Sequence, residues 1–98
     1  MENLRIAFDV DGTLINEQGI EHTKIAQLLM TLARMKNTTI IVWSGGGRDY
    51  AQMYVDRMVL GKYVDIVMAK DENFHIDIAF DDQHEFSLAD KNIIVRLK

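Results

Sequence analysis

Residues 4–13 read LRIAFDVDGT, an apolar run followed by two aspartates, a glycine and a threonine. The apolar run predicts a short buried β-strand over 4–8, and the DVDG that follows predicts a turn. Asp9 and Asp11 therefore come directly after the first strand. Two solvated turn carboxylates are the plain alternative, because aspartate is common in turns.

The rest of the chain alternates between helical and strand-like patterns. Apolar residues recur at helical spacing from Ile25 to Leu32, which predicts a helix over 23–35 with Thr23 as a candidate N-cap. A second helix is expected over 48–60, with Gly61 as its stop. The β-branched and apolar runs that predict four further strands lie at 38–43, 64–68, 76–80 and 93–97.

This alternation decides the expected fold class. Strands joined through helices form parallel βαβ units with right-handed crossovers. We therefore expect an α/β fold, a three-layer sandwich around a mostly parallel, Rossmann-like sheet of about five strands. With 98 residues the chain has room for one core, so residues 1–98 are expected to form a single domain.

The composition excludes several classes of protein. Apolar residues make up 48%, as in globular domains, and 11 basic against 15 acidic residues give a net charge of −4. This charge opposes attraction to phosphate backbones, so sequence-independent nucleic-acid binding is not expected. The chain has no apolar run of the ~20 residues that span a bilayer and no signal-peptide pattern, which predicts a cytoplasmic protein without membrane contact. Because the chain has no cysteine, the side chains available for catalysis or metal binding are carboxylates, hydroxyls, lysine and histidine.

Polar side chains follow four of the predicted strands. In open parallel sheets, ligands bind beyond the carboxyl ends of the strands, near the point where the strand order reverses. The residues expected at this edge are Asp9 and Asp11 after the first strand, Ser44 after the second, Lys70 after the third, and Asp81 and Asp82 after the fourth. The sequence therefore predicts one site that combines carboxylates, a hydroxyl and an ammonium group.

The four aspartates of this edge indicate a hard divalent cation. Like charges at close range repel, so such a group of carboxylates needs a cation nearby. Mg²⁺ prefers carboxylate and water oxygens, and the absence of clustered histidine or cysteine disfavours zinc. The candidate ligands of Mg²⁺ are Asp9, Asp11, Asp81 and Asp82.

If a phosphate binds at this edge of the sheet, each type of polar residue there has a chemical role. Asp9 can attack phosphorus to form a transient aspartyl phosphate, and Asp11 can act as the general acid and base. Ser44 opens a glycine-rich turn whose hydroxyl and amides can hold phosphate oxygens, although it could instead only cap the next helix. Lys70 supplies positive charge, or is an ordinary surface lysine. The remaining expected substrate-binding residues are Gly12, Thr13 and Gly45.

These residues match a known family pattern. DVDGT at 9–13 resembles the DxDGT signature of the haloacid dehalogenase-like phosphatases, and IIVWS at 40–44, Lys70 and IAFDD at 78–82 resemble its other three motifs in order. The resemblance implies Asp9 as nucleophile and Asp11 as general acid and base. It also implies phosphate contacts from Ser44 and Lys70, and Mg²⁺ on Asp9, the Asp11 carbonyl, and Asp81 or Asp82.

The chain differs from larger members of that family in the lengths of its connections. Neither gap that could hold a cap has more than a hairpin and one helix, so the resemblance implies a small, capless member with an open site. An open site suits a large, even macromolecular, phosphorylated substrate or a neighbouring subunit of a homo-oligomer that serves as the lid. Only ten residues separate Lys70 from Asp81, too few for the usual helix, and so short a loop need not aim the lysine at the site.

Two other interpretations compete with a Mg²⁺-dependent phosphatase. A non-catalytic module of the same fold, which binds phosphate or a protein partner, fits the small size and the short third segment. A phospho-accepting receiver domain is disfavoured, because it carries its acidic pair and its phosphorylated aspartate on different strands, ahead of the hydroxyl and the lysine. Two groups are expected to have no catalytic role: surface histidines at 22, 75 and 84, and a core or subunit-contact stripe of Tyr50, Tyr54 and Met58.

Overall fold

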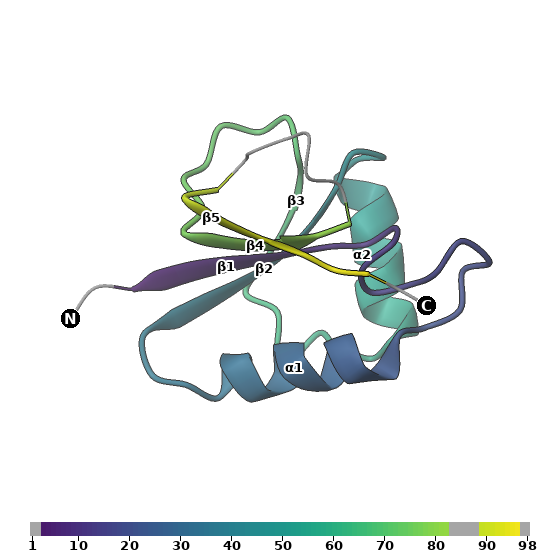
Figure 1. The fold of residues 1–98 in the computed structure, drawn as a ribbon, viewed down its shortest axis with the longest axis horizontal. Helices are drawn as coiled ribbons and strands as arrows, with labels where there is room; N and C mark the ends of the chain where they lie inside the picture. Colours follow the sequence, from purple (N-terminus) through teal and green to yellow (C-terminus); the bar gives the residue numbers. More distant parts are fainter. Residues whose placement is uncertain (1–2, 83–88, 97–98) are drawn as a thin grey trace.

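The structure, a computed structural model, describes residues 3–82 and 89–96. Its elements are, in chain order, β1 (Leu4–Asp9), α1 (Thr23–Ala33), β2 (Thr38–Ser44), α2 (Arg48–Arg57), β3 (Ile66–Ala69), β4 (Ile78–Asp81) and β5 (Lys91–Ile94). The five strands form one sheet in the order β3-β2-β1-β4-β5, and every neighbouring pair is parallel (Figure 1). The predicted α/β fold with a parallel sheet is confirmed, and this order is compatible with a Rossmann-like layout.

β1 and β2 lie next to each other in the interior of the sheet, where both of their faces are covered. Ile6 pairs with Ile40 and Phe8 with Val42 across the two strands. The side chains of both strands are buried from these isoleucines onward, as expected where a parallel strand is covered on both faces. The residues at the carboxyl ends of β1 and β2 are therefore held by a fully packed core.

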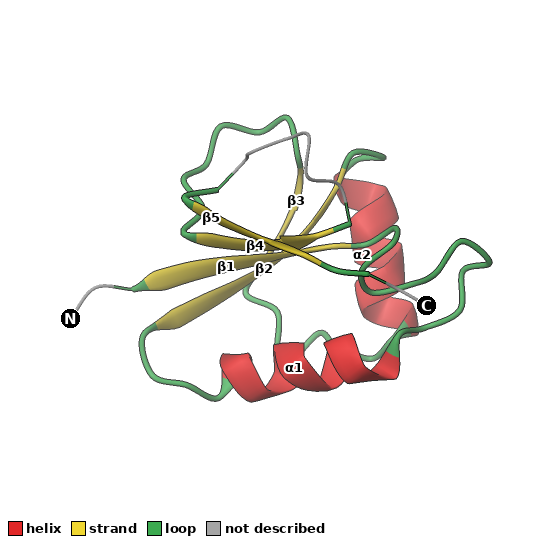
Figure 2. Ribbon diagram, in the orientation of Figure 1, coloured by secondary structure: helices red, strands yellow, loops and turns green. Residues whose placement is uncertain are grey.

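The two helices of the described residues cover the same face of the sheet. Leu29 of α1 and Val55 of α2 belong to one apolar cluster with Ile6, Phe8 and Val42. Figure 2 shows α1 on one side of the sheet and the loop from β3 to β4 on the other. The apolar stripe predicted over 23–35 thus faces the sheet, and so does that of α2.

The opposite face is covered by the connection between β3 and β4. Ile76 belongs to a second apolar cluster with Ala7, Ile41 and Trp43, and Phe74 packs against it. Residues 70–77 are too few for a helix with a turn at each end, because a helix needs several turns to bury a face. A helical third layer is therefore not confirmed in the described part of the chain.

The last strand begins at a position other than that predicted, and the N-cap of the first helix is another residue than the predicted one. β5 covers Lys91–Ile94 instead of 93–97, because its pairing with β4 begins at Lys91, opposite Ile78. Leu97, the last residue of the predicted strand, lies outside the described residues. The N-cap of α1 is His22, which makes no side-chain cap hydrogen bond, and Thr23 is already helical.

Both helices also end earlier than positions 35 and 60, at Ala33 and Arg57. After α2, Val59 adopts a left-handed backbone with a φ of +57°, and its N–H donates to the Asp56 carbonyl. The Leu60 N–H donates to the Val55 carbonyl at 2.9 Å. This pair of bonds is a Schellman motif, which ends a helix, so α2 stops before Gly61 is reached.

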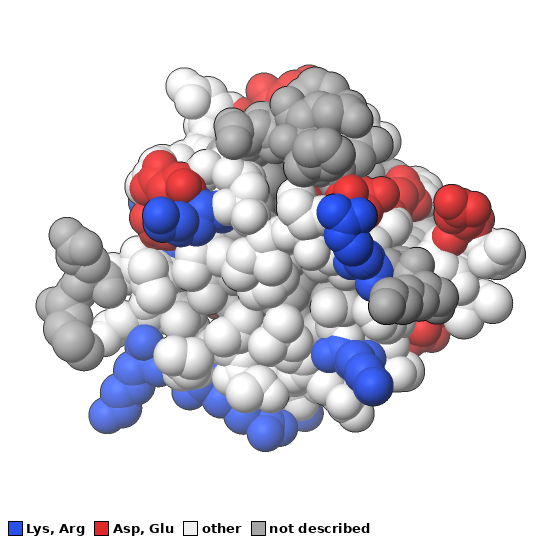
Figure 3. Space-filling model, in the orientation of Figure 1, with Lys and Arg blue, Asp and Glu red and all other residues white. Residues whose placement is uncertain are grey.

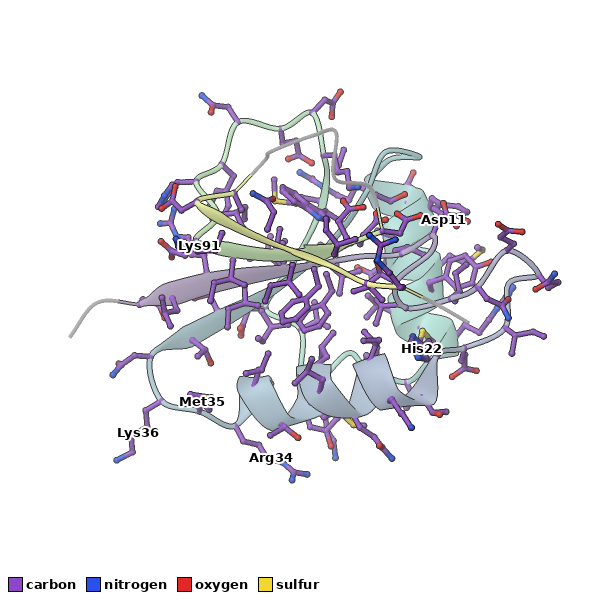
Figure 4. All side chains as sticks on the ribbon, viewed as in Figure 1. Asp11, His22, Arg34, Met35, Lys36 and Lys91 are labelled. Atoms are coloured by element: carbon purple, nitrogen blue, oxygen red, sulfur yellow. The ribbon has the colours of Figure 1, made fainter. Side chains whose placement is uncertain are left out.

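The molecule has one markedly acidic end. In Figure 3 several acidic side chains lie at the right-hand end, and basic ones lie along the side that α1 covers. Figure 4 places Asp11 at this acidic end and Lys91, the first residue of β5, at the other, so the strands finish at the acidic end. Among the helices of the described ranges, none has the length and apolar character needed to cross a bilayer.

Candidate active site at the carboxyl edge of the sheet

Lys70 links the two aspartates at the ends of β1 and β4. Its Nζ lies 3.0 Å from Asp9 Oδ1 and 2.6 Å from Asp81 Oδ2. Both aspartates are buried, with an exposed fraction of 6% each. β1 and β4 are the neighbours at which the strand order reverses, which is where ligands bind in open parallel sheets. The short connection after Lys70 therefore does aim its ammonium group at the predicted site.

Hydrogen bonds around Lys70 explain why its side chain points toward the site. The Lys70 N–H donates to the Ser44 carbonyl at 3.1 Å, which extends the pairing of β2 with β3 by one residue. Glu72 then turns the chain back, because its Oε2 accepts from the Ala69 N–H at 2.6 Å and its other oxygen pairs with Arg48 of α2. These bonds hold the start of the connection while the lysine side chain crosses toward β1.

The carboxylates of the site are electrostatically strained without a cation. Burial raises the pKa of Asp9 to about 7, although Lys70 opposes the shift, and the charge of Asp81 raises it further. Burial also raises the pKa of Asp82, followed by its hydrogen bond and charge interaction with Asp81. Burial disfavours the charged form of Lys70, but its bonds to Asp81 and Asp9 outweigh this and raise its pKa. Negative charge is therefore in excess at this edge.

Three of the four predicted metal ligands converge. Carboxylate oxygens of Asp9, Asp81 and Asp82 all lie within 4.8 Å of one another. An all-oxygen set of this kind fits a hard cation such as Mg²⁺, which would also relieve the excess of negative charge. The Asp11 carboxylate is not part of this group, because its Oδ1 accepts a hydrogen bond from the Tyr50 hydroxyl at 2.7 Å.

The glycine-rich turn after β2 forms the other wall of the site. A hollow of about 290 Å³ is lined by Asp9, Asp11, Lys70 and Asp82 on one side and by Gly45 and Gly46 on the other. Neither glycine carries a side chain to fill it, so backbone groups can approach an anion closely.

Ser44 stabilises this turn through a hydrogen bond of its side chain. It is almost fully buried, and its Oγ accepts from the Gly46 N–H at 3.0 Å. The N-cap of α2 is Gly47, with a φ of +106°, so Ser44 is not the cap of this helix. Gly45 and Gly46, and not Ser44, line the hollow itself.

Gly12 brings the turn after β1 against Asp82. Its φ is +81°, and a Cβ added to it would lie 2.2 Å from Asp82 Oδ2. Only glycine fits there, which explains why the DVDG turn can close over the carboxyl end of β4. Thr13 is fully buried, and its hydroxyl has no hydrogen-bond partner among the described residues. Thr13 lines neither of the two hollows next to Asp11, so the structure does not place it against a substrate.

Tyr50 has a role at the site that its sequence pattern did not indicate. Tyr54 and Met58 of the same stripe are buried in the core, as expected, whereas Tyr50 reaches Asp11. The hydrogen bond to Asp11, and then burial, raise the pKa of the Tyr50 hydroxyl. Its position in the sequence could have indicated this role, because Tyr50 lies in the first turn of the helix that follows the glycine-rich turn.

Of the histidines, His75 is exposed, and its Nε2 lies 2.9 Å from Asp90 Oδ2 at the amino end of the sheet. With Asp77 these residues form a second group that could hold a metal, far from the site along the strands. His22 is half-buried, with Nδ1 3.3 Å from the Thr13 carbonyl. His84, the third histidine predicted to lie at the surface, falls outside the described residues.

Fold and site together define a small parallel α/β protein with an acidic, lysine-bridged site at the carboxyl edge of its sheet. No family model, no curated protein and no solved structure matches the chain.

Proposed function

We propose that this chain is a Mg²⁺-dependent phosphohydrolase that forms an aspartyl phosphate on Asp9. The observation that carries the proposal is the position of the Lys70 ammonium group, within hydrogen-bond distance of both Asp9 and Asp81 and next to the hollow lined by Gly45 and Gly46. A phosphate in this hollow would have a nucleophile on one side and backbone amides on the other.

The proposed reaction has two steps. In the first, an Asp9 carboxylate oxygen forms a bond to phosphorus while the bond from phosphorus to the leaving oxygen breaks. The leaving oxygen keeps that electron pair and takes a proton from Asp11. In the second, Asp11 takes a proton from water as the water oxygen bonds to phosphorus, and the bond to Asp9 breaks. This releases inorganic phosphate and restores the Asp9 carboxylate.

Lys70 and the turn after Ser44 serve both steps. Lys70 offsets the negative charge of Asp9 and of the transferring group, which otherwise repel each other. In the turn, the Gly45 N–H would hold an oxygen that does not react, because the N–H groups of Gly46 and Gly47 already donate to Ser44. The residues that would hold Mg²⁺ are Asp9, Asp81 and Asp82, with the Asp11 carbonyl as implied by the family resemblance. When bound, Mg²⁺ supplies charge neutralisation between the carboxylates and the phosphate.

The proposal includes a relationship to the haloacid dehalogenase-like phosphatases, in a small capless form. Two observations support it: DVDGT lies at the end of an interior strand, and Lys70 and Asp81 of the later motifs meet Asp9. The helix expected on the second face is, in this proposal, reduced to residues 70–77.

A non-catalytic phosphate-binding module is the second candidate. One contact favours it: the Tyr50 hydroxyl donates to Asp11. This bond occupies Asp11 Oδ1 and holds the carboxylate against α2, so a leaving group would have to compete with Tyr50 for it.

The test is hydrolysis of an aryl phosphate with and without Mg²⁺ by the parent protein and by Asp9→Asn. We expect Mg²⁺-dependent turnover in the parent and a loss of about 10³-fold or more in Asp9→Asn, because the amide cannot attack phosphorus. Asp56→Asn is the matched control, since this exposed aspartate of α2 bonds only within its helix surface, to Gln52. Turnover that survives in Asp9→Asn would exclude the mechanism. Folded protein that binds Mg²⁺ and hydrolyses no ester would favour the binding module.

A further inference from the structure

We infer that a second hollow beside Asp11, walled by Tyr50, Tyr54 and the turn over residues 15–19, binds the leaving group, and that it selects phosphomonoesters of uncharged, ring-sized alcohols. This inference rests on the proposed function and adds the class of substrate. The described residues place the second hollow directly against the first, and its lining differs from that of the first in shape and in charge.

The two hollows share a wall. Asp11 and Asp82 line both the phosphate hollow of about 290 Å³ and the second one of about 510 Å³. Asp11 is the residue proposed to protonate the leaving oxygen, so that oxygen must lie within hydrogen-bond reach of it. With the phosphoryl group between Asp9 and the glycine-rich turn, the rest of the ester extends past Asp11 into the larger hollow.

One wall of the larger hollow is a fixed pair of aromatic rings. The Tyr50 and Tyr54 rings meet edge to face, with centroids 5.2 Å apart and planes at 67°. Tyr50 is held at its other end by the hydroxyl bond to Asp11, and Gly46 lies so close behind it that an added Cβ would be 3.2 Å from Tyr50 Cδ2. Rigid aromatic walls with a few polar groups are typical of sites for ring-shaped ligands.

The opposite wall is a turn that is also held in place. Asn16 Oδ1 accepts from the N–H groups of Gln18 and Ile20, both at 2.9 Å. Asn16 N–H in turn donates to the Ile20 carbonyl, and Gly19 adopts a φ of +77° to close the turn. Both walls are thus set before a ligand binds, and a volume of about 510 Å³ lies within the range of sites for small-molecule ligands.

The charge of the lining decides which rings are accepted. The lining residues include three carboxylates, Asp11, Glu17 and Asp82, and neither lysine nor arginine. Mg²⁺ would neutralise Asp82 and Asp11 carries the proton for the leaving oxygen, but Glu17 keeps its negative charge facing the leaving group. A second phosphate or a carboxylate on the leaving group is therefore repelled, whereas a neutral sugar or aromatic ring is not.

The test compares kcat/KM in saturating Mg²⁺ for five phosphate compounds: a hexose 6-phosphate, phenyl phosphate, glycerol phosphate, a hexose 1,6-bisphosphate and acetyl phosphate. We expect the bisphosphate and the acyclic glycerol ester to be about tenfold or more below the better of the two ring monoesters. That better substrate distinguishes a sugar from an aromatic leaving group. Glycerol phosphate tests the ring requirement at unchanged charge.

Two charge-reversal variants test the role of the lining. Glu17→Lys should raise kcat/KM for the bisphosphate by about threefold or more relative to the monophosphate, because it removes a repelling charge and adds an attracting one. Glu21→Lys, an equal charge change at an exposed residue outside the hollow, should leave that ratio unchanged.

Three outcomes overturn the inference. It is wrong if the bisphosphate or the glycerol ester matches the ring monoesters, or if Glu17→Lys and Glu21→Lys change the ratio equally. Acetyl phosphate separates this failure from failure of the proposed function, because its leaving group is too small to need the second hollow. If acetyl phosphate is hydrolysed but no ring preference exists, only the inference fails. If nothing is hydrolysed, the proposed function fails and the inference with it.

Discussion

Lys70 is the only described cation within ion-pair distance of Asp9 and Asp81, and it is largely buried with them. A buried ion pair brings little net stability, but the loss of one partner leaves uncompensated charge in the interior. Here one ammonium group serves two carboxylates, so its loss would remove a positive charge from beside both. The site and the fold therefore depend on the same side chain.

We expect Lys70→Met to lower the free energy of unfolding by about 3 kcal/mol and to abolish turnover. Saturating Mg²⁺ should restore part of the stability, because it supplies positive charge to the same carboxylates. Denaturant unfolding with and without Mg²⁺ measures both effects. Lys36→Met, at an exposed position, is the control and should change stability by less than about 0.5 kcal/mol. A Lys70→Met protein as stable as the parent without Mg²⁺ would show that the ion pairs contribute nothing.

Tyr50 offers a test of the two roles proposed for Asp11. Its hydroxyl donates to Asp11 Oδ1 and so positions the carboxylate that accepts a proton from water in the second step. We expect Tyr50→Phe to slow the hydrolysis of the aspartyl phosphate more than its formation. In rapid-mixing experiments with an aryl phosphate, the variant should release a larger initial burst of the aryl alcohol, followed by a slower steady rate.

The Tyr63→Phe variant removes a hydroxyl outside both hollows and should behave like the parent. A proportional loss of burst and steady rate in Tyr50→Phe would instead mean that Tyr50 only positions the substrate.

At the level of elements, two aspartates determine how the short strands begin. The Asp65 N–H donates to the Ile40 carbonyl, and its Oδ2 accepts from the Ile40 N–H at 2.8 Å. Asp77 makes the same pair of bonds with the backbone of Arg5, also at 2.8 Å to the carboxylate. Each side chain thus supplies an acceptor that the sheet lacks just before β3 or β4 begins. These carboxylates are structural, although in the sequence they look like those of the site.

The end of α2 carries a residue that is unsuited to its backbone. Val59 has a φ of +57°, a left-handed conformation that costs a non-glycine residue about 1–2 kcal/mol and a β-branched one more than most. Its side chain is exposed, so it gains little from packing. We expect Val59→Gly to raise the free energy of unfolding by about 1 kcal/mol.

Val59→Ala is the informative control, because alanine keeps the Cβ that clashes in this conformation and should gain less. Thermal unfolding of the three proteins would measure the difference. A Val59→Gly protein that is less stable than the parent would mean that flexibility of the unfolded chain outweighs the strain.

At the level of the whole molecule, the site links stability to pH. The pKa of Asp9 is raised to about 7, against ~3.9 for an exposed aspartate. The folded protein therefore keeps this proton where the unfolded chain has lost it. The contribution of Asp9 to the free energy of unfolding is fully present below about pH 4 and is lost as the pH rises through 7.

Mg²⁺ should act in the opposite direction, because it binds the ionised carboxylates. We expect saturating Mg²⁺ to raise the Tm little at pH 5 and markedly at pH 8, and Asp9→Asn to remove most of this difference. Unfolding can be followed by the fluorescence of Trp43, the only tryptophan, which pairs with Asp9 across β1 and β2. An equal Mg²⁺ effect at both pH values would exclude Asp9 as a ligand.

The α/β class and the approximate position of every element could be predicted from local sequence patterns. Apolar runs and helical spacing are local patterns, and local patterns decide strand and helix formation where the core lies close by. The same reasoning placed the aspartates, Ser44 and Lys70 at strand ends, because the carboxyl ends of parallel strands share one edge. Boundaries were predicted least well: a local Schellman motif ends α2 before Val59, and pairing with β4 begins β5 at Lys91.

Which of these residues meet, and through which atoms, depends on the folded arrangement and could not be predicted from local patterns. The strand order, the position of both helices on one face, and the reach of Lys70 across two strands depend on contacts between residues far apart in the chain. The hydrogen bond from Tyr50 to Asp11 and the close approach of Gly12 to Asp82 also depend on contacts between residues far apart in the chain. Such contacts leave no periodic signal in the sequence, because they are set by the packing of whole elements against one another.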